Sequence, residues 1–278
     1  MSEATPSLAA PARQSRAARE PRGSGWGWRV LAPVLALVGL ITVWQLVTAL
    51  GGVDPTIMPS PLRVLDSGWK ARDQLVTATL ATLQITVLGL LAACVAAVVI
   101  ASALSFLPPL RQTVLPLMIG AQSVPIIVLA PLFIIWFGFD SGPKILLVAI
   151  VSALPLTIST LQGLLSADPD IATLMRSMGA SPMKIFLRLR IGSALPSFFT
   201  GLRIVTSFIV VSAIFSEYVG AKEGLGIFMQ TQKNLYRTDL VFSAVLVSIV
   251  IGLALFALTY ALQALVMPWE RRRKAAGR

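Results

Sequence analysis

Long apolar stretches alternate with short polar segments along this chain. A helix that crosses the hydrocarbon core of a bilayer needs about 20 consecutive, mostly apolar residues. Six stretches reach that length, at positions 30–50, 78–106, 114–137, 145–165, 195–217 and 240–267. The pattern predicts an all-α, polytopic membrane protein with about six transmembrane helices.

This pattern divides the chain into a transmembrane domain, residues 29–267, and two basic tails, residues 1–28 and 268–278. The first tail is rich in Ala, Pro, Ser and Arg, a composition typical of disorder. The first apolar stretch is long, contains Trp44 and lacks a small-x-small cleavage site. It is therefore predicted to be a retained helix rather than a signal peptide.

The composition supports a membrane protein and excludes several kinds of chemistry. Of 278 residues, 56% are hydrophobic and 13% charged, with a mean hydropathy of +0.81, as expected for an integral membrane protein. The chain has no His, and its single cysteine, Cys94, lies in an apolar stretch. No zinc cluster, disulfide framework or Cys/His nucleophile is expected.

The net charge of +11 is explained by membrane topology, without a nucleic-acid partner. If both termini are cytoplasmic, 16 of the 23 Lys and Arg residues face the cytoplasm and seven face the outside among seven acids. The seven outer residues are Arg63, Lys70, Arg72, Lys144, Lys222, Lys233 and Arg237. The positive-inside rule favours this orientation. The basic residues after Trp269 are expected to contact lipid headgroups.

The predicted spans are almost free of charge. Arg203 lies near the inner end of the fifth stretch and Glu217 at its outer end. Proton- and sodium-coupled transporters usually carry ionisable residues inside the membrane. The chain also lacks the Gly-x-x-x-x-Gly-Lys-Ser/Thr loop that cradles nucleotide phosphates. Uphill transport would therefore take its energy from a separate subunit.

A polar, basic segment at 168–190 interrupts the apolar pattern. Asp168 can cap one short helix, Gly179 can end it, and Ser181-Pro182 can start a second. The apolar positions at helical spacing are Ile171, Leu174, Met175 and Met178, then Met183, Phe186 and Leu187. Such helices can either dock on a partner or lie under the lipid headgroups.

The sequence Gly179-Ala-Ser, followed by Phe186, Arg188 and Ala194-Leu-Pro196-Ser-x-x-x-Gly201-Leu-Arg203, resembles the cytoplasmic "EAA" loop of bacterial ABC importer permeases. The family's Glu-Ala-Ala positions fall on Thr173, Leu174 and Met175, so its acid is missing here. Its first Leu-Pro falls on Ile191-Gly192, whereas Leu195-Pro196 is intact. The resemblance runs from about residue 78 to 265 and implies a type I ABC importer (MetI-like) permease fold in a bacterial inner membrane.

The resemblance also implies the partners. The loop at 166–194 would dock on P-loop ATPase subunits, which bind ATP and Mg²⁺, so no cofactor is expected in this chain. The positions implied to couple the two subunits are Thr173, Leu174, Met175, Arg176, Ser177, Met178, Gly179, Ala180 and Ser181. A separate extracytoplasmic binding protein would select the solute. A second permease subunit, forming a homodimer, would complete the path.

The stretch Ser216-Glu-Tyr-Val-Gly220-Ala-x-x-Gly224-Leu-Gly226 resembles permeases of the nitrate, sulfonate and taurine group. Its continuation to Ala244 is similar to members associated with thiamine pyrimidine precursors, which implies a small organic solute or anion such as a heterocycle. The residues alone predict a flexible, glycine-rich outer loop. Glu217, Gly220, Gly224 and Gly226 are candidates for an outer gate or a contact with the binding protein.

Polar positions within the spans are candidates for the solute path. In the third stretch, Gln122-Ser123-Val-Pro125 interrupts the helix and can free backbone carbonyls. Gln84 and Gln162 are further candidates, although each can instead form an interhelical hydrogen bond, as can Gln263. The alternative function is an ATP-independent channel or facilitator, but no filter sequence is present. An enzyme is not expected, because no catalytic constellation is found.

Overall fold

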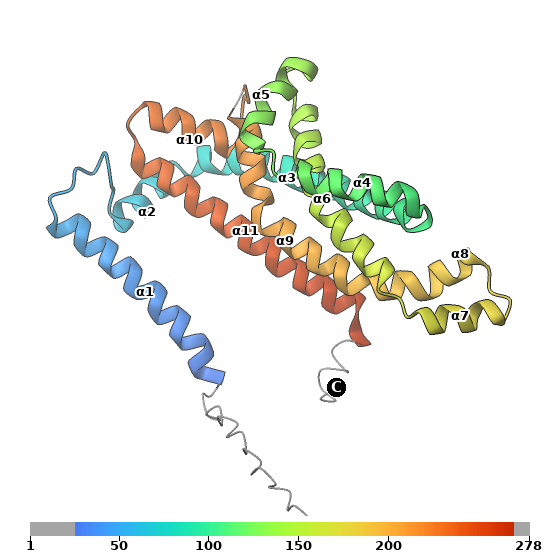
Figure 1. Cartoon of the computed structure of the whole chain (residues 1–278). Coiled ribbons are helices and arrows are strands. Elements are labelled where there is room, and N and C mark those ends of the chain that lie inside the picture. Colours follow the sequence, from blue (N-terminus) through green and yellow to red (C-terminus); the bar gives the residue numbers. More distant parts are fainter. Residues whose placement is uncertain (1–25, 219, 270–278) are drawn as a thin grey trace, which may run out of the picture.

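The structure is a computed structural model that describes residues 26–218 and 220–269. The N-terminal tail, which is predicted to be disordered, and the C-terminal basic run lie almost wholly outside these residues. All secondary structure in the described part of the chain is helical, which confirms the all-α prediction (Figure 1). The helices are α1 Trp26–Leu50, α2 Pro61–Lys70, α3 Arg72–Phe106, α4 Pro108–Ala121, α5 Ile126–Phe137, α6 Ser141–Leu165, α7 Pro169–Ser177, α8 Pro182–Ile185, the π-helix η1 Phe186–Arg190, α9 Ile191–Glu217, α10 Leu225–Asn234 and α11 Thr238–Val266.

Five helical spans are long and apolar enough to cross a membrane: α1, α3, α6, α11 and the continuous segment Pro182–Glu217. The third predicted stretch forms α4 and α5, which are bent by 102° relative to each other. The break lies at residues 122–125, where the sequence predicts it. Proline at 125 lacks the N–H that a continuous helix would need.

Contacts at the two ends of the bundle show that α4 and α5 together cross it. At one end, Arg190 donates a hydrogen bond to the Ser105 carbonyl (3.4 Å), so α3 ends where the segment leading into α9 begins. At the other end, Phe139, just before α6, lies against Gly220, just after α9. The chain between α3 and α6 must therefore run from one end to the other. With this broken span counted as one, the described chain has six helical segments that are long and apolar enough to cross a membrane.

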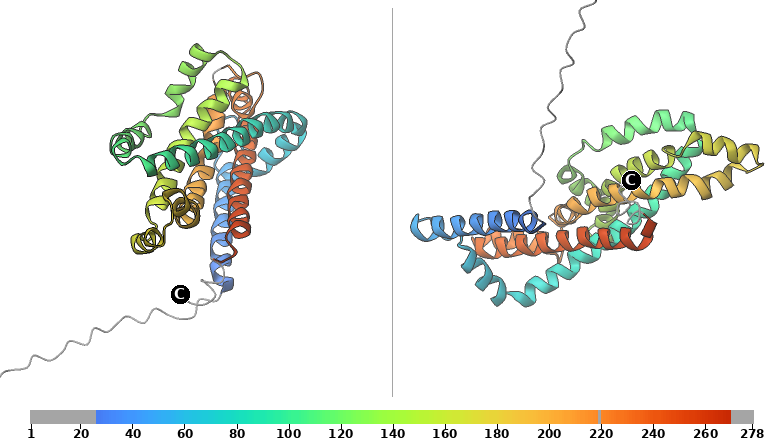
Figure 2. Two further views of the ribbon diagram at one scale, coloured as in Figure 1. Left: turned by 90° about the vertical axis from the view of Figure 1, so that its right-hand side faces the viewer. Right: turned by 90° about the horizontal axis from the view of Figure 1, so that it is seen from below.

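We call the end that carries α7 and α8 the loop end, and the opposite end the α10 end. Figure 1 shows the start of α1 and the end of α11 toward the loop end, with α2 and α10 at the other. The further views in Figure 2 show α7 and α8 projecting beyond the bundle. An even number of crossings explains why both ends of the helical region lie on one side.

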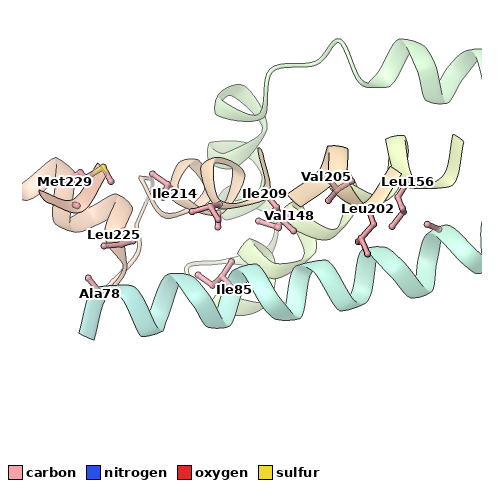
Figure 3. Packing of buried hydrophobic residues seen from close by; sticks show 14 of the residues in the cluster. Ala78, Ile85, Val148, Leu156, Leu202, Val205, Ile209, Ile214, Leu225 and Met229 are labelled. Atoms are coloured by element: carbon pink, nitrogen blue, oxygen red, sulfur yellow. The ribbon is translucent and has the colours of Figure 1, made fainter. Parts of the chain in front are cut away.

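The core lies where α3, α6 and α9 pack closely. A side chain at Gly163 would meet the Ala194 Cα at 2.8 Å, and one at Gly201 would meet the Ser159 Cβ at 2.6 Å, so these glycines allow α6 and α9 to approach. Small residues serve this role in membrane helix packing. The row Ala93, Ala97 and Ala101 of α3 is fully buried, as its small side chains predict. Figure 3 shows Ile85 of α3 facing Val148 of α6 and the α9 residues of the same cluster.

The periphery is largely apolar and exposed in the isolated subunit. Most described side chains of α1 are exposed, and its ring contact with α11 joins Trp44 and Phe242, 5.6 Å apart. Helix α2, which the apolar pattern of the sequence does not predict, is held on α11 by two hydrogen bonds. Ser67 donates to Asp239 (2.6 Å) and Ser243 donates to the Val64 carbonyl (2.7 Å).

Three further expectations are corrected. The glycine-rich segment predicted to be a flexible loop continues after Gly224 into a helix, α10. The second helix of the polar segment is not separate, because α8 and η1 continue without interruption into α9. The second span begins at Arg72 rather than at residue 78.

Candidate functional site

The first arm of the polar segment is α7, whose two ends are fixed by local hydrogen bonds. Asp168 accepts hydrogen bonds from the N–H groups of Asp170 (2.8 Å) and Ile171 (3.4 Å), as a capping residue does. At the other end Gly179 has φ +79°. Its N–H donates to the Arg176 carbonyl, and the Ala180 N–H donates to the Met175 carbonyl, both at 2.9 Å. This is the Schellman arrangement, and it confirms the predicted helix end at Gly179.

The second arm begins as predicted and is anchored to the bundle. Ser181 accepts a hydrogen bond from the Lys184 N–H (3.3 Å), and Pro182 occupies the first turn. Further along, the Phe186 ring lies 4.9 Å from the Phe106 ring at the end of α3. Together with the Arg190–Ser105 hydrogen bond, this contact fixes the base of the arm, whereas its tip projects away from the helices.

The tip is folded but uncovered. Helix α7 has no buried residue. Leu174 is 61% exposed and Met178 78%, and on the second arm Met183 and Leu187 are also exposed. No atom lies within 4 Å of the position that a Gly179 side chain would take. The predicted coupling residues, from Thr173 to Ser181, therefore gather on one projecting hairpin of helices that presents both apolar and basic groups.

At the α10 end, the Glu217 carboxylate is fully buried and holds the backbone that starts α10. Its Oε2 accepts a hydrogen bond from the Gly226 N–H (2.7 Å). The neighbouring Leu225 N–H donates to Thr82 Oγ1 of α3 (2.8 Å). A side chain at Gly224 would lie 2.5 Å from Glu217 Oε2, and one at Gly226 would lie 2.8 Å from the Glu217 Cβ. Glycine is therefore needed at both positions.

Lys144 joins this group from α6. Its side chain is buried and donates to the carbonyls of Phe139 (2.6 Å) and Asp140 (3.2 Å). Its ammonium also attracts the Glu217 carboxylate. We call Thr82, Lys144, Glu217, Gly224, Leu225 and Gly226 the Glu217 cluster.

The sequence pattern points to Glu217, Gly220, Gly224 and Gly226 but not to Thr82 and Lys144. Gly220 adjoins the cluster and packs on the Phe139 ring. In this arrangement the Glu217 side chain faces the protein interior, so it positions the surrounding backbone rather than presenting a charge to solvent. A lysine four residues after Asp140, at the very start of an apolar stretch, was the available signal for Lys144. Thr82 carried no signal, because its partner lies 143 positions away.

The predicted path residues are distributed over three parts of the fold. Gln84 is exposed on α3 and Gln162 on α6, and Gln122 and Ser123 are exposed at the break between α4 and α5. Of the four, Gln122 lines a cavity of about 450 Å³, whose other walls include Leu154 of α6 and Phe208 of α9.

Arg203 and Gln263 form a polar contact between α9 and α11. Arg203 donates to Gln263 Oε1 (2.9 Å) and to Thr200 Oγ1 (3.1 Å), and its guanidinium lies 4.9 Å from the centre of the Tyr260 ring. Gln263 thus forms an interhelical hydrogen bond, the alternative considered for it. Among the described residues, no group of three or more His, Cys, Asp or Glu side chains could hold a metal ion.

Residues 85–272 match the family described as "Binding-protein-dependent transport system inner membrane component". The chain belongs to this family. It is therefore an ABC importer permease and a multi-pass membrane protein, not an enzyme.

Two relatives illustrate the range of the family. The permease is 30% identical over 247 residues to the formylaminopyrimidine transport permease protein ThiX of Halalkalibacterium halodurans, covering 88% of this chain and 98% of that protein. It is 29% identical over 256 residues to the taurine transport system permease protein TauC of Escherichia coli, covering 88% and 93%. These relatives confirm the nitrate, sulfonate and taurine-like group and its pyrimidine branch.

Solved structures support the fold. A chain of the MetNI methionine ABC transporter, in an inward-facing conformation, matches with a TM-score of 0.56 at 22% identity. The match covers 69% of this permease and 97% of that chain. A chain of an amino acid ABC transporter matches with a TM-score of 0.53 at 20% identity, covering 74% and 97%. The permease therefore has the predicted MetI-like fold.

Proposed function

We propose that this permease forms the solute path of its importer and that the loop at 166–194 docks on a separate P-loop ATPase in the cytoplasm. The observation that carries the proposal is a loop that is folded yet uncovered. Caps at Asp168 and Ser181 and the Schellman turn at Gly179 give it a fixed shape. Exposed apolar side chains such as Leu174 and Met178 are typical of a surface that a partner covers.

The break between α4 and α5 supports a second subunit. Residues 122–125 leave the helical hydrogen-bond pattern and are exposed in the isolated subunit. Irregular backbone at membrane depth is tolerated only where protein covers it or water fills a cavity. We place this face, with Gln122 and Ser123, toward a homodimer axis that carries the path. Gln84 and Gln162 remain further candidates for its lining.

Transport would then follow a rigid-body switch. ATP and Mg²⁺ bind to the ATPase subunits, whose closure moves the loop around Gly179. The attached helices change between inward-facing and outward-facing arrangements. An extracytoplasmic binding protein delivers the solute at the α10 end, near Gly220, Gly224 and Gly226.

The proposed solute is a small organic molecule or anion, with a pyrimidine-like heterocycle as the first candidate. The relative named for formylaminopyrimidine supports this choice. The name of the taurine relative supports a broader class of small organic solutes. Binding assays on the partner binding protein, with a pyrimidine and taurine as alternative ligands, would separate the two.

The proposed orientation places both termini and the loop end in the cytoplasm, because the basic residues concentrate there. Cysteine labelling tests it with Ser177→Cys and Lys222→Cys, after Cys94→Ser has removed the natural thiol. An impermeant reagent added to intact cells should label position 222 and spare position 177. Labelling of position 177 from outside would refute the orientation.

Reconstitution into vesicles tests the function itself. The permease with its ATPase and binding protein should move solute only when ATP is supplied. The permease alone should show no flux. Solute flux through the permease alone would instead support a channel or facilitator.

A further inference from the structure

We infer that the Glu217 cluster is a latch that makes α10 move as one body with α9 and the adjoining ends of α3 and α6, so that motion of the cytoplasmic loop reaches the outer surface. The inference deepens the proposed function and rests on it for the identity of the moving loop. Glu217, Thr82 and Lys144 are positioning residues in this view. None of them needs to touch the solute.

The first observation is the continuity of one helical segment. From Pro182, next to the turn at the loop tip, the helix runs through η1 and α9 to Glu217 without a gap. Its 36 residues span about 50 Å at the helical rise of about 1.5 Å per residue. The latch residue is the last residue of this segment, so the loop and the latch occupy opposite ends of one connected element.

The second observation is how α10 is attached. Its first two backbone N–H groups donate to side chains of other helices, Leu225 to Thr82 of α3 and Gly226 to Glu217 of α9. Gly224 and Gly226 lie against the Glu217 side chain with no room for a Cβ. Because α10 begins in these contacts, its first turn cannot leave α9 unless the Gly226–Glu217 hydrogen bond breaks.

The third observation is the buried charge. Glu217 is 0% exposed, and its Oε1 has no hydrogen-bond partner among the described residues. Burial of a carboxylate is costly, and the Gly226 hydrogen bond and the Lys144 charge offset only part of that cost. If α10 moved away, the carboxylate would lose its backbone donor while it remained buried. The closed latch is therefore favoured strongly over partial opening.

A second link ties the neighbouring loop to the same point. Lys144 holds the carbonyls of Phe139 and Asp140, and the Phe139 ring fills the space where a Gly220 side chain would be. Gly220 has φ +75°, a conformation that favours glycine. The connection from α5 to α6 is therefore gathered around the end of α9 as well.

The test uses the complete complex of permease, ATPase and binding protein in lipid nanodiscs and vesicles. A spin label at Gln230, an exposed position on α10, reports the mobility of that helix. Glu217→Ala removes the acceptor for the Gly226 N–H, whereas Glu217→Gln keeps an amide oxygen there. Asp66→Asn, an exposed acid on α2, is the matched control.

Glu217→Ala should assemble and keep basal ATP hydrolysis within about twofold of the wild-type rate. Its label should become more mobile, and uptake should fall by about tenfold or more, as expected for loss of a buried charge-assisted hydrogen bond. Glu217→Gln should restore most of the uptake and the immobile spectrum, and Asp66→Asn should match the wild type. A Glu217→Ala complex with an immobile label and full uptake would overturn the inference.

A second variant and a measurement on the permease alone separate failure of the latch from failure of the proposed function. If Glu217→Ala does not assemble, Thr82→Val decides, because it removes the acceptor for the Leu225 N–H at nearly constant volume. An immobile label and wild-type uptake in Thr82→Val would then count against the latch. If the wild-type permease neither binds an ATPase nor shows ATP-driven uptake, the proposed function fails, whereas label mobility in the permease alone still tests the attachment of α10.

Discussion

Glycine serves different purposes at the two ends of this permease. At the loop end, Gly179 adopts φ +79° in open space, with no atom within 4 Å of a potential side chain. At the α10 end, Gly226 does not have a positive φ, but a side chain there would meet Glu217 and the Ile214 carbonyl. The first glycine shapes a surface, and the second permits close packing.

The difference shows which end of the permease is buried within a single subunit and which end is left uncovered. The Glu217 cluster satisfies its backbone donors with side chains of α3 and α9, and it is buried without a partner protein. The loop tip satisfies its backbone locally and leaves its apolar side chains uncovered. Substitutions at the α10 end should therefore affect the folded subunit itself, whereas substitutions at the loop end should affect assembly.

The largest effect on stability is expected for Gly226→Ala. Its new methyl group would overlap the Ile214 carbonyl and lie 2.8 Å from the Glu217 Cβ, so backbone must shift. Overpacking of this kind costs about 1–3 kcal/mol. Unfolding of the purified subunit in mild detergent should show the loss. Gly39→Ala, at an open helical position on α1, is the control and should be neutral or slightly stabilising. Equal stability of the two variants would contradict the comparison.

Gly179→Val should have a smaller effect on stability and a larger one on assembly. A β-branched residue at φ +79° costs about 1 kcal/mol or more in backbone strain. The variant should insert and dimerise, yet lose ATPase association and ATP-driven uptake together. Pull-down and vesicle uptake measure both. Gly179→Asn, which tolerates this conformation, should retain them. Normal ATPase binding and uptake by the valine variant would count against docking at this turn.

A weaker interaction is expected between Arg203 and Gln263. This contact joins α9 to the last turn of α11 and includes one hydrogen bond at 2.9 Å. Polar contacts between membrane helices contribute about 0.6 kcal/mol on average. A double-mutant cycle with Arg203→Met and Gln263→Leu should give a coupling energy of that size. A coupling above about 2 kcal/mol would exceed what such contacts contribute and would contradict this ranking.

The smallest effect is expected at the exposed pair of Asp66 and Lys70 on α2. Their charged atoms are 2.6 Å apart, but the side chains are 60% and 73% exposed. Helix pairs of this kind contribute about 0.3–0.5 kcal/mol and are screened by salt. Lys70→Met should therefore leave the unfolding midpoint nearly unchanged at physiological ionic strength. A large loss of stability in Lys70→Met would contradict this expectation, because it would mean that an exposed ion pair stabilises this end as much as a buried contact does.

The features that the sequence predicts well are long or strictly local. Six apolar stretches, the break before Pro125 and the caps at Asp168 and Ser181 all follow from residues close together in the chain. The Gly179 turn is equally local, since its hydrogen bonds join residues 175–180. Periodicity and capping rules are sufficient for such elements.

The features that escaped prediction depend on distant contacts. Helices α2 and α10 have ten residues each, too few for a reliable periodic signal, and both are held by other helices. Glu217 is at the end of an apolar stretch, where an exposed carboxylate was the simpler expectation. Its burial depends on Thr82, Lys144 and Gly226, which only the tertiary fold brings together.

The five-residue π-helix at Phe186–Arg190 has a consequence for the changes of length that this segment can tolerate. A π-turn contains about one residue more than the α-turn it replaces. Deleting one residue here would therefore close the π-turn to an α-turn and leave the loop tip facing nearly the same way. The same deletion in a regular part of α9 would rotate the loop tip by about 100° around the helix axis. The π-turn thus marks the point where one residue can be lost while the docking hairpin and the Glu217 end both keep their register.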